Sequence, residues 1–147
     1  MIKRNLISEI DKISEELFLP YSNDQKEENK VSELQVHKIL YILYGNFYSK
    51  FSKELFDAKF QAWQYGPVEL DYRKKNNHKF NLSLEEEEYA FVAKTVKNLL
   101  RFSPWALVYF THNTDPWKKN YEKGKNNISI SNVDIQKWFE ENKNHKF

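Results

Sequence analysis

The stretch Ala62-Trp63-Gln64-Tyr65-Gly66-Pro67-Val68 decides the fold more than any other part of the sequence, because it concentrates backbone constraints within a few residues. Gly66 can adopt a positive φ without a Cβ clash, whereas Pro67 fixes φ at about −65° and removes an amide donor. We therefore expect a sharp turn walled by Trp63 and Tyr65. Aromatic side chains at such a turn usually pack inward, so Trp63 and Trp117 are predicted core residues; a peptide-docking surface is the alternative.

Outside this turn the chain mostly follows a helical period. Apolar residues at three- and four-residue steps predict a first helix from Ile2 that stops at Pro20, followed by a polar loop. Further helices are predicted over about 32–48 and 83–102, from Ser103-Pro104, from Asp115-Pro116 and from 131 onward. Ile128 and Ile130 alternate with serine in a short extended piece. The sequence predicts a mainly α, single compact helical domain of about six to seven helices, with at most a minor short strand pair.

The helix predicted from Ser32 to about Tyr48 is apolar on two faces. Ser32 with Gln35 forms a capping box at its start, as Ser83 with Glu86 does for a later helix. One face of the earlier helix carries Val36, Leu40, Leu43 and Phe47, and the other carries Leu34, Tyr41 and Tyr48, with Lys38 and Gly45 between them. Such a helix is expected at the centre of the fold.

Composition limits the function classes. The chain has 147 residues, a formal net charge of +2 and no cysteine, which excludes disulfides and thiolate metal sites. No apolar run has the length of a signal peptide core or a membrane span, so we expect one cytoplasmic domain over 1–147. The histidines, His37, His78, His112 and His145, lack paired metal-ligand spacing, and we predict neither a metal nor another cofactor.

Two residues are candidates for chemistry. His112 lies between two predicted helices, where a carboxylate such as that of Asp115 could charge it as a general base, but we favour a structural tie of the turn. Lys38 lies on an apolar face, where we expect an ion pair with Asp57 or Glu69, or an extended side chain that reaches solvent. We predict that the protein is not an enzyme.

The segment 73–79 is the one concentrated basic run, with Arg73, Lys74 and Lys75 at its start. Tyr72 and Phe80 flank it, so base stacking combined with phosphate contacts on nucleic acid is physically possible. A solvated loop is the favoured alternative, because asparagine-rich basic stretches satisfy turn chemistry without a partner.

Three segments together resemble a known family. Gln35-Val36-His37-Lys38-Ile39-Leu40-Tyr41 is similar to the Lys-Leu-Gln-Lys-Leu-Leu-Tyr opening of the Panacea domain, the SocA-like antitoxin family that includes phage-associated GepA-type proteins. Phe110-Thr111-His112-Asn113-Thr114-Asp115-Pro116-Trp117 resembles its Leu-Thr-His-x-Glu-x-Pro-Trp element. Leu55-Phe56-Asp57 and the turn at Gly66 lie between them in the family order. The resemblance covers 32–139 and leaves 1–30 outside.

The resemblance implies an antitoxin that neutralises a toxin protein by direct contact, with delivery of the toxin to a protease in SocA-like members. The motif residues, which we expect to be mostly structural, are Lys38, Tyr41, Asp57, Trp63, Tyr65, Gly66, Pro67, Thr111, His112, Pro116 and Trp117. His37 and Thr114 stand where the family has Gln and Glu. We expect the partner surface on the N-terminal helix and on the loop with Arg73, Lys74 and Lys75. A nucleic-acid-binding regulator that uses 73–79 is the alternative function.

Overall fold

The computed structural model describes residues 2–18 and 31–144, and its central element is helix α2 (Glu33–Phe51). The predicted capping box is confirmed: Ser32 Oγ accepts the Gln35 amide at 3.1 Å, and Gln35 Oε1 accepts the Ser32 amide at 3.1 Å. The helix ends at Phe51 rather than at about Tyr48, where Ser52 turns into the left-handed region with φ 55°.

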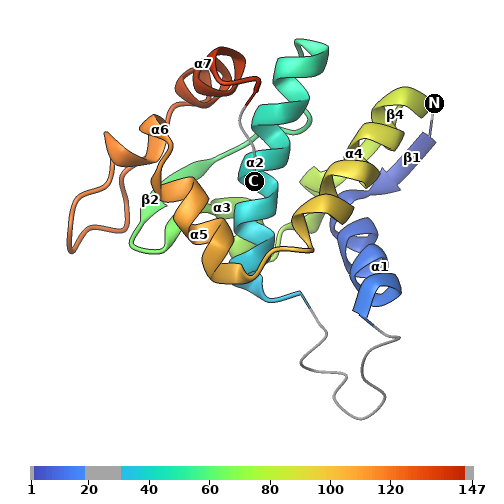
Figure 1. Ribbon diagram of the computed structural model, residues 1–147, viewed down its shortest axis with the longest axis horizontal. Coiled ribbons are helices and arrows are strands. Elements are labelled where there is room, and N and C mark those ends of the chain that lie inside the picture. The colour runs from blue at the N-terminus through green and yellow to red at the C-terminus, as the bar shows by residue number, and fades with distance from the viewer. Residues whose placement is uncertain (1, 19–30, 145–147) are drawn as a thin grey trace.

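Helix α2 runs through the middle of the molecule and separates two groups of elements (Figure 1). One side holds β2 (Phe60–Trp63), β3 (Gly66–Glu69), α5 (Pro104–His112), α6 (Asp115–Lys118) and α7 (Asn132–Glu141). The other side holds β1 (Ile2–Asn5), α1 (Leu6–Phe18), β4 (Asn81–Leu84) and α4 (Glu86–Leu99). The short helices α3 (Leu70–Arg73) and η2 (Asn77–Phe80) lead from β3 to β4.

The predicted central position of α2 is confirmed by its burial, which extends around the whole helix from Gln35 to Gly45. Gly45 has a packing role, because a Cβ at this position would overlap the ring of Phe139 on α7. Phe139 also lies edge-to-face with Tyr41, with ring centroids 5.7 Å apart. Glycine therefore lets α7 dock closely on α2.

The N-terminal prediction is wrong for its first four residues. Residues 2–5 form strand β1, which pairs antiparallel with β4 so that Ile2 lies opposite Leu84 and Arg4 opposite Leu82. Strand β4 buries alternate residues, Leu82 and Leu84, as one face of a sheet requires. The helix begins only at Leu6. Its predicted stop at Pro20 and the loop over 21–30 lie outside the described residues.

The pairing of β4 also corrects a predicted helix start. Ser83 lies in the strand and does not cap a helix. Helix α4 instead begins after Glu85, whose amide donates to Glu88 Oε1 at 3.0 Å. Glutamate performs here the same reciprocal capping that was expected of Ser83.

The later helix starts agree with the predictions to within a residue. Ser103 Oγ accepts the Ala106 amide at 3.1 Å and caps α5. Helix α6 begins at Asp115, one residue before the predicted Pro start, and Ser131 precedes α7. The extended piece around Ser129 makes only a single bridge, to Gln61. The mainly α fold class is confirmed, and the structure contains two small two-stranded sheets.

Candidate partner interface around the Gly66 turn

Strands β2 and β3 form an antiparallel hairpin that Gln64 and Tyr65 connect, with Trp63 opposite Gly66. Gly66 has φ 105°, a conformation that residues with a Cβ rarely adopt. An added Cβ would also lie 2.7 Å from Thr111 Oγ1 and 2.8 Å from Lys38 Cε. Both the backbone angle and the surrounding atoms thus require glycine, and the predicted sharp turn is confirmed.

Three side chains from distant parts of the chain donate hydrogen bonds to backbone carbonyls of this hairpin. Trp117 Nε1 donates to Trp63 O at 2.8 Å, and Lys38 Nζ donates to Pro67 O at 3.0 Å. His112 Nε2 lies 2.9 Å from Gln64 O, and because a carbonyl only accepts, this nitrogen carries the proton. The three motif segments therefore meet at one turn and hold its backbone in place.

A further hydrogen-bond chain connects α2 to the junction of α5 and α6. Thr114 Oγ1 donates to Thr111 O at 2.7 Å, so Tyr41 must be the donor in its 2.7 Å contact with Thr114 Oγ1. Burial raises the pKa of the Tyr41 hydroxyl above its ordinary value, which keeps it protonated as this donor role requires. Thr114, which replaces the family glutamate, thus has a defined structural partner.

Lys38 neither forms the expected ion pair nor reaches solvent. Its side chain is fully buried, so it does not reach solvent, and Asp57 is exposed at the surface. The Glu69 carboxylate accepts the amides of Lys59 at 2.8 Å and Tyr72 at 3.0 Å instead. The predicted ion pair is therefore wrong. Burial lowers the pKa of the Lys38 ammonium to about 7, and no carboxylate in the described part of the chain forms an ion pair with it.

His112 connects α5 to the hairpin through its hydrogen bond to Gln64 O, and within the described residues its ring forms no ion pair with Asp115. Its ring stacks on Trp117 with centroids 4.0 Å apart and an interplanar angle of 17°. Burial lowers the pKa of the imidazole, and the positive charge of Lys38 acts in the same direction. The neutral ring with its proton on Nε2 is the form that the hydrogen bond to Gln64 uses, which favours the structural role over a general base.

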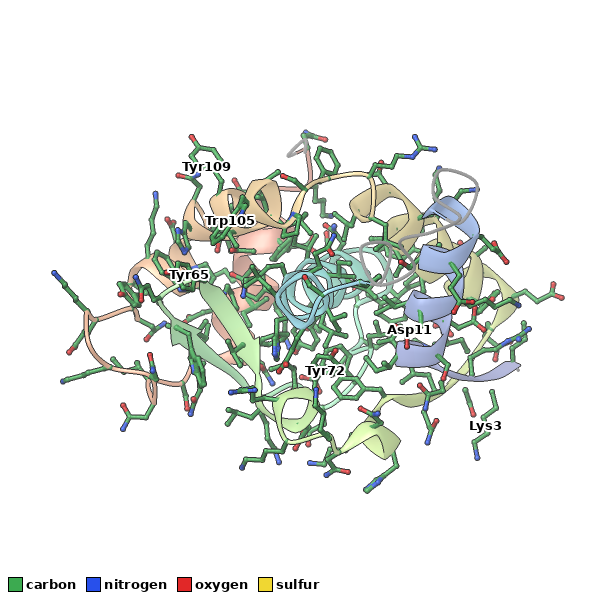
Figure 2. All side chains as sticks on the ribbon, turned by 90° about the horizontal axis from the view of Figure 1, so that it is seen from below. Lys3, Asp11, Tyr65, Tyr72, Trp105 and Tyr109 are labelled. Atoms are coloured by element: carbon green, nitrogen blue, oxygen red, sulfur yellow. The ribbon has the colours of Figure 1, made fainter. Side chains whose placement is uncertain are left out.

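We call Lys38, His112 and Trp117, which donate to the hairpin carbonyls, the hub. Beside the hub, three aromatic side chains are exposed to solvent. Tyr65, Trp105 and Tyr109, which we call the aromatic surface, have exposed fractions of 49%, 60% and 74%. Figure 2 shows the three side chains on the same part of the molecule. Tyr65 meets Trp105 edge-to-face, with ring centroids 5.5 Å apart. The expectation that aromatic residues at the turn pack inward is wrong for Tyr65.

The helical wheel of α5 contained the signal for this surface. Trp105 and Tyr109 are one turn apart, whereas Leu107 and Thr111 on the opposite side of the helix are buried. Our core prediction holds for Trp117, which is buried, but Trp63 is only half-buried. Position in a family motif therefore does not by itself indicate which tryptophan is buried.

The predicted basic loop lies apart from the aromatic surface, as the position of Tyr72 in Figure 2 indicates. Arg73 lies 3.1 Å and Lys75 3.7 Å from carboxylate oxygens of Glu33, so the single negative charge of this residue offsets part of the charge of the loop. Lys74 is exposed beside them. Nucleic-acid binding by this loop stays a prediction.

Other site classes find little support in the part of the chain that the structure describes. Within 2–18 and 31–144, no group of three or more His, Cys, Asp or Glu side chains is arranged to hold a metal ion. Across the same residues, no helix is both long and apolar enough to cross a membrane.

Comparison with known proteins agrees with the motif geometry. The family model of the SocA-like antitoxins, the Panacea domain, matches residues 36–118, a narrower range than the predicted 32–139. This range runs from α2 to α6 and includes all three donors to the hairpin. No curated protein and no solved structure matches the chain significantly. Because the match spans more than half of the sequence, the chain belongs to the SocA-like antitoxin family, with a Panacea domain.

Proposed function

We propose that this protein is an antitoxin that neutralises a partner toxin by direct contact, and that the aromatic surface is the centre of that contact. Family membership supports the antitoxin role in general terms. The single observation that carries the specific proposal is the exposure of Tyr65, Trp105 and Tyr109 beside the family motifs. Tyrosine and tryptophan are the residues that most often dominate the binding energy of protein interfaces.

The hub restrains the backbone that carries the aromatic surface. The hydrogen bond from His112 to Gln64 O restrains the residue next to Tyr65. Trp105 and Tyr109 project from a helix whose other face is buried. Little backbone freedom is left to lose on binding, so more of the contact energy contributes to affinity. The family motifs would then serve binding indirectly, by presenting these rings.

The test is co-expression of the tagged protein with the product of each neighbouring gene. A harmful neighbour whose toxicity the protein relieves, and which co-purifies with it, would identify the toxin. Replacement of Trp105 and Tyr109 by serine should then weaken the complex by at least about tenfold and abolish the rescue of growth.

Val133→Ser provides the matched control, because Val133 is also a large apolar residue with 66% of its surface exposed but lies on α7. It should leave both rescue and co-purification unchanged. Full rescue by the Trp105 and Tyr109 double variant, in a protein with an unchanged far-ultraviolet circular dichroism spectrum, would refute the proposal.

The N-terminal helix and the 73–79 loop remain proposed parts of the same interface. Deletion of 1–30 is an unsuitable test, because Leu6 and Ile10 are core residues and β1 pairs with β4. Charge reversal at the exposed residues Lys12 and Glu16 probes the helix without removing the core. Loss of rescue would place α1 in the interface, and unchanged rescue would exclude these two positions.

Delivery of the toxin to a protease is a separate proposal. Inhibition of the purified toxin by the purified protein would support neutralisation by contact alone. If inhibition instead requires cells, and the half-life of the toxin shortens when this protein is present, the adaptor mechanism would be favoured.

A further inference from the structure

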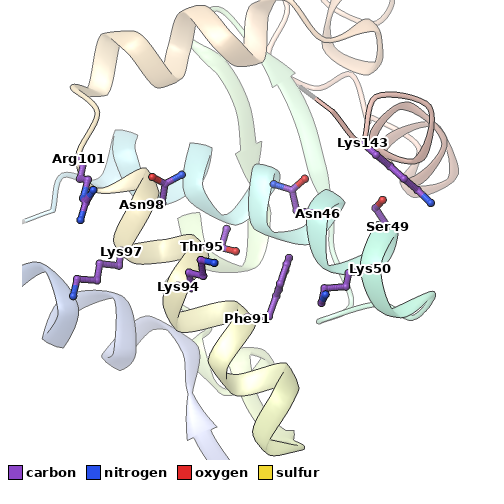
Figure 3. A pocket seen from close by; sticks show the side chains of 10 residues that line it. All are labelled: Asn46, Ser49, Lys50, Phe91, Lys94, Thr95, Lys97, Asn98, Arg101 and Lys143. Atoms are coloured by element: carbon purple, nitrogen blue, oxygen red, sulfur yellow. The ribbon is translucent and has the colours of Figure 1, made fainter. Parts of the chain in front are cut away.

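A second surface feature lies away from the aromatic surface, between α2 and α4 and next to the end of α7. It is an open hollow of about 1100 Å³, shown from close by in Figure 3, which we call the basic groove. Its lining residues are Asn46, Ser49, Lys50, Phe91, Lys94, Thr95, Lys97, Asn98, Arg101 and Lys143.

The lining of the basic groove follows the helical repeat of both walls. The wall formed by α4 shows residues at three- and four-residue steps: Phe91, Lys94 and Asn98 on the helix, and Arg101 just after its end. Where two helices face each other, such a stripe is usually apolar and buried. Here all of these residues except Phe91 are basic or amide-bearing, so the stripe presents hydrogen-bond donors to solvent.

The charge of the basic groove is one-sided. Its lining contains five cationic residues and no carboxylate, although the whole chain has a formal net charge of only +2, so the remainder of the chain is net acidic. Among the described residues, Lys50, Lys94, Lys97 and Arg101 form no ion pair. Lys143 does, with Glu140 at 2.7 Å.

A second hollow, between α1 and α4, adjoins the basic groove and carries carboxylates. Glu9 and Glu16 line it together with Lys94 and Lys97, whose side chains lie on the ridge between the two hollows. Glu9 already accepts the hydroxyl of Tyr89 at 2.8 Å and pairs with Arg4 at 3.6 Å. In the part of the chain that the structure describes, four of the five cations of the basic groove are thus without an ion pair and can bind an external anion.

We propose that the basic groove binds single-stranded nucleic acid. Cations repeated along its walls suit a ligand with a negative charge at every nucleotide. Asn46, Asn98 and Thr95 carry side chains that can both donate to and accept from base edges. The ring of Phe91, which is half-buried against Phe51, lies between Lys50 and Lys94 in Figure 3 and is the aromatic side chain of the groove on which we expect a base to stack.

The shape of the site argues for a single strand over a duplex. Proteins that read a duplex insert a projecting helix or ribbon into the major groove, whereas the basic groove is a concavity between two helices. A small apolar ligand does not fit either, because such sites are lined mainly by hydrophobic residues. The residues involved are distinct from Tyr65, Trp105 and Tyr109, so this inference is independent of the toxin contact.

The experiment is a fluorescence-anisotropy titration of the full-length protein against labelled oligo-deoxythymidine and oligo-uridine of about 20 nucleotides, long enough to cover a site. Two triple variants that remove the same charge are compared: Lys94→Gln, Lys97→Gln, Arg101→Gln in the groove, and Arg73→Gln, Lys74→Gln, Lys75→Gln in the loop. The groove variant should weaken binding at least about tenfold and reduce the slope of log K against log salt by about 2, and the loop variant should do neither.

Three results would overturn the inference. The first is absence of binding even at low salt. The second is an equal loss in both variants, which would indicate general electrostatic attraction. The third is tighter binding of a duplex of the same length, or displacement of the oligonucleotide by poly-glutamate at an equal concentration of charge, which would indicate a duplex or an acidic protein segment. Circular dichroism of each variant confirms that it is folded.

Discussion

Lys38 and Lys50 belong to the same helix, α2, yet their surroundings are opposite. Lys38 is fully buried at the Gly66 turn and donates to Pro67 O at 3.0 Å. Lys50 is exposed at the basic groove, where its ammonium lies 5.8 Å from the ring centroid of Phe91. Lys38 at the turn is paired internally, whereas Lys50 at the groove forms no ion pair among the described residues.

The contrast teaches that burial, and not residue type, decides what a lysine does. Desolvation at the turn makes the ammonium of Lys38 costly and commits it to one carbonyl, so its role is to hold the backbone. At the groove, Lys50 stays solvated, so its charge carries little desolvation free energy and can pair with an anionic ligand. Three predictions test this contrast, in order of decreasing effect.

Gly66→Ala should lower the free energy of unfolding by about 2–5 kcal/mol. A positive φ costs a residue with a Cβ about 1–3 kcal/mol, and overlap with Thr111 and Lys38 adds a similar amount. Gly124→Ala is the matched control, because Gly124 has φ 84° but no atom within 4 Å of the added Cβ. It should cost only about 1 kcal/mol. Denaturant unfolding of both variants measures the difference, and equal losses would show that packing at the turn contributes nothing.

Lys38→Met should change how stability depends on pH, whereas Lys50→Met should not. Burial lowers the pKa of Lys38 to about 7 from its ordinary value of 10.5. Below pH 7 the lysine is charged in both states, and the folded state bears the full cost of burying the ammonium. Between pH 7 and 10.5 only the unfolded state holds the proton, so the free energy of unfolding rises with pH, by up to about 1.4 kcal/mol per unit.

Denaturant unfolding at several pH values from 7 to 9 checks this prediction. The slope should persist in Lys50→Met and disappear in Lys38→Met. Parallel profiles for the wild type and Lys38→Met would contradict the assignment of a buried, unpaired ammonium. The difference between the slopes of the wild type and Lys38→Met reports the burial of this one group at the turn.

Tyr41→Phe should have the smallest effect, a loss of about 1 kcal/mol. The variant removes one buried hydrogen bond, to Thr114 Oγ1, but Thr114 keeps its own bond to Thr111 O. Tyr44→Phe removes the bond to Glu54 and the one that its hydroxyl accepts from Gln136, but it should cost less, because Glu54 is exposed and can bind water, and Gln136 also lies 3.4 Å from Glu54 Oε1. Thermal unfolding of the two variants ranks them, and a larger loss for Tyr44→Phe would be inconsistent with this account.

Local signals in the sequence predicted much of the fold. The Ser32 and Ser103 caps, the two-faced helix α2 and the turn at Gly66 all depend on residues that are neighbours in the chain. Strand β1 was missed because it exists only through pairing with β4, whose residues are about 80 positions away. Local periodicity carries no information about such a partner, so Ile2 was assigned to the helix that follows.

The candidate sites were less predictable than the fold. The motif residues were named, but the carbonyls that Lys38, His112 and Trp117 bind were not, because a backbone acceptor leaves no mark in the sequence. The basic groove was also missed. Its cations are spread over α2, α4, the turn after α4 and the chain after α7, so they do not form one continuous basic run in the sequence.

By itself, the sequence determined the helix-rich composition, the glycine that the turn requires, and the family, since each depends on residue identity in short segments. Only the tertiary structure decided which charged and aromatic residues are buried and which are exposed. Lys38 and Lys50, or Trp117 and Trp105, are chemically equivalent as sequence letters. Their roles differ because burial is a property of the whole packed chain, and the cost of desolvation follows from it.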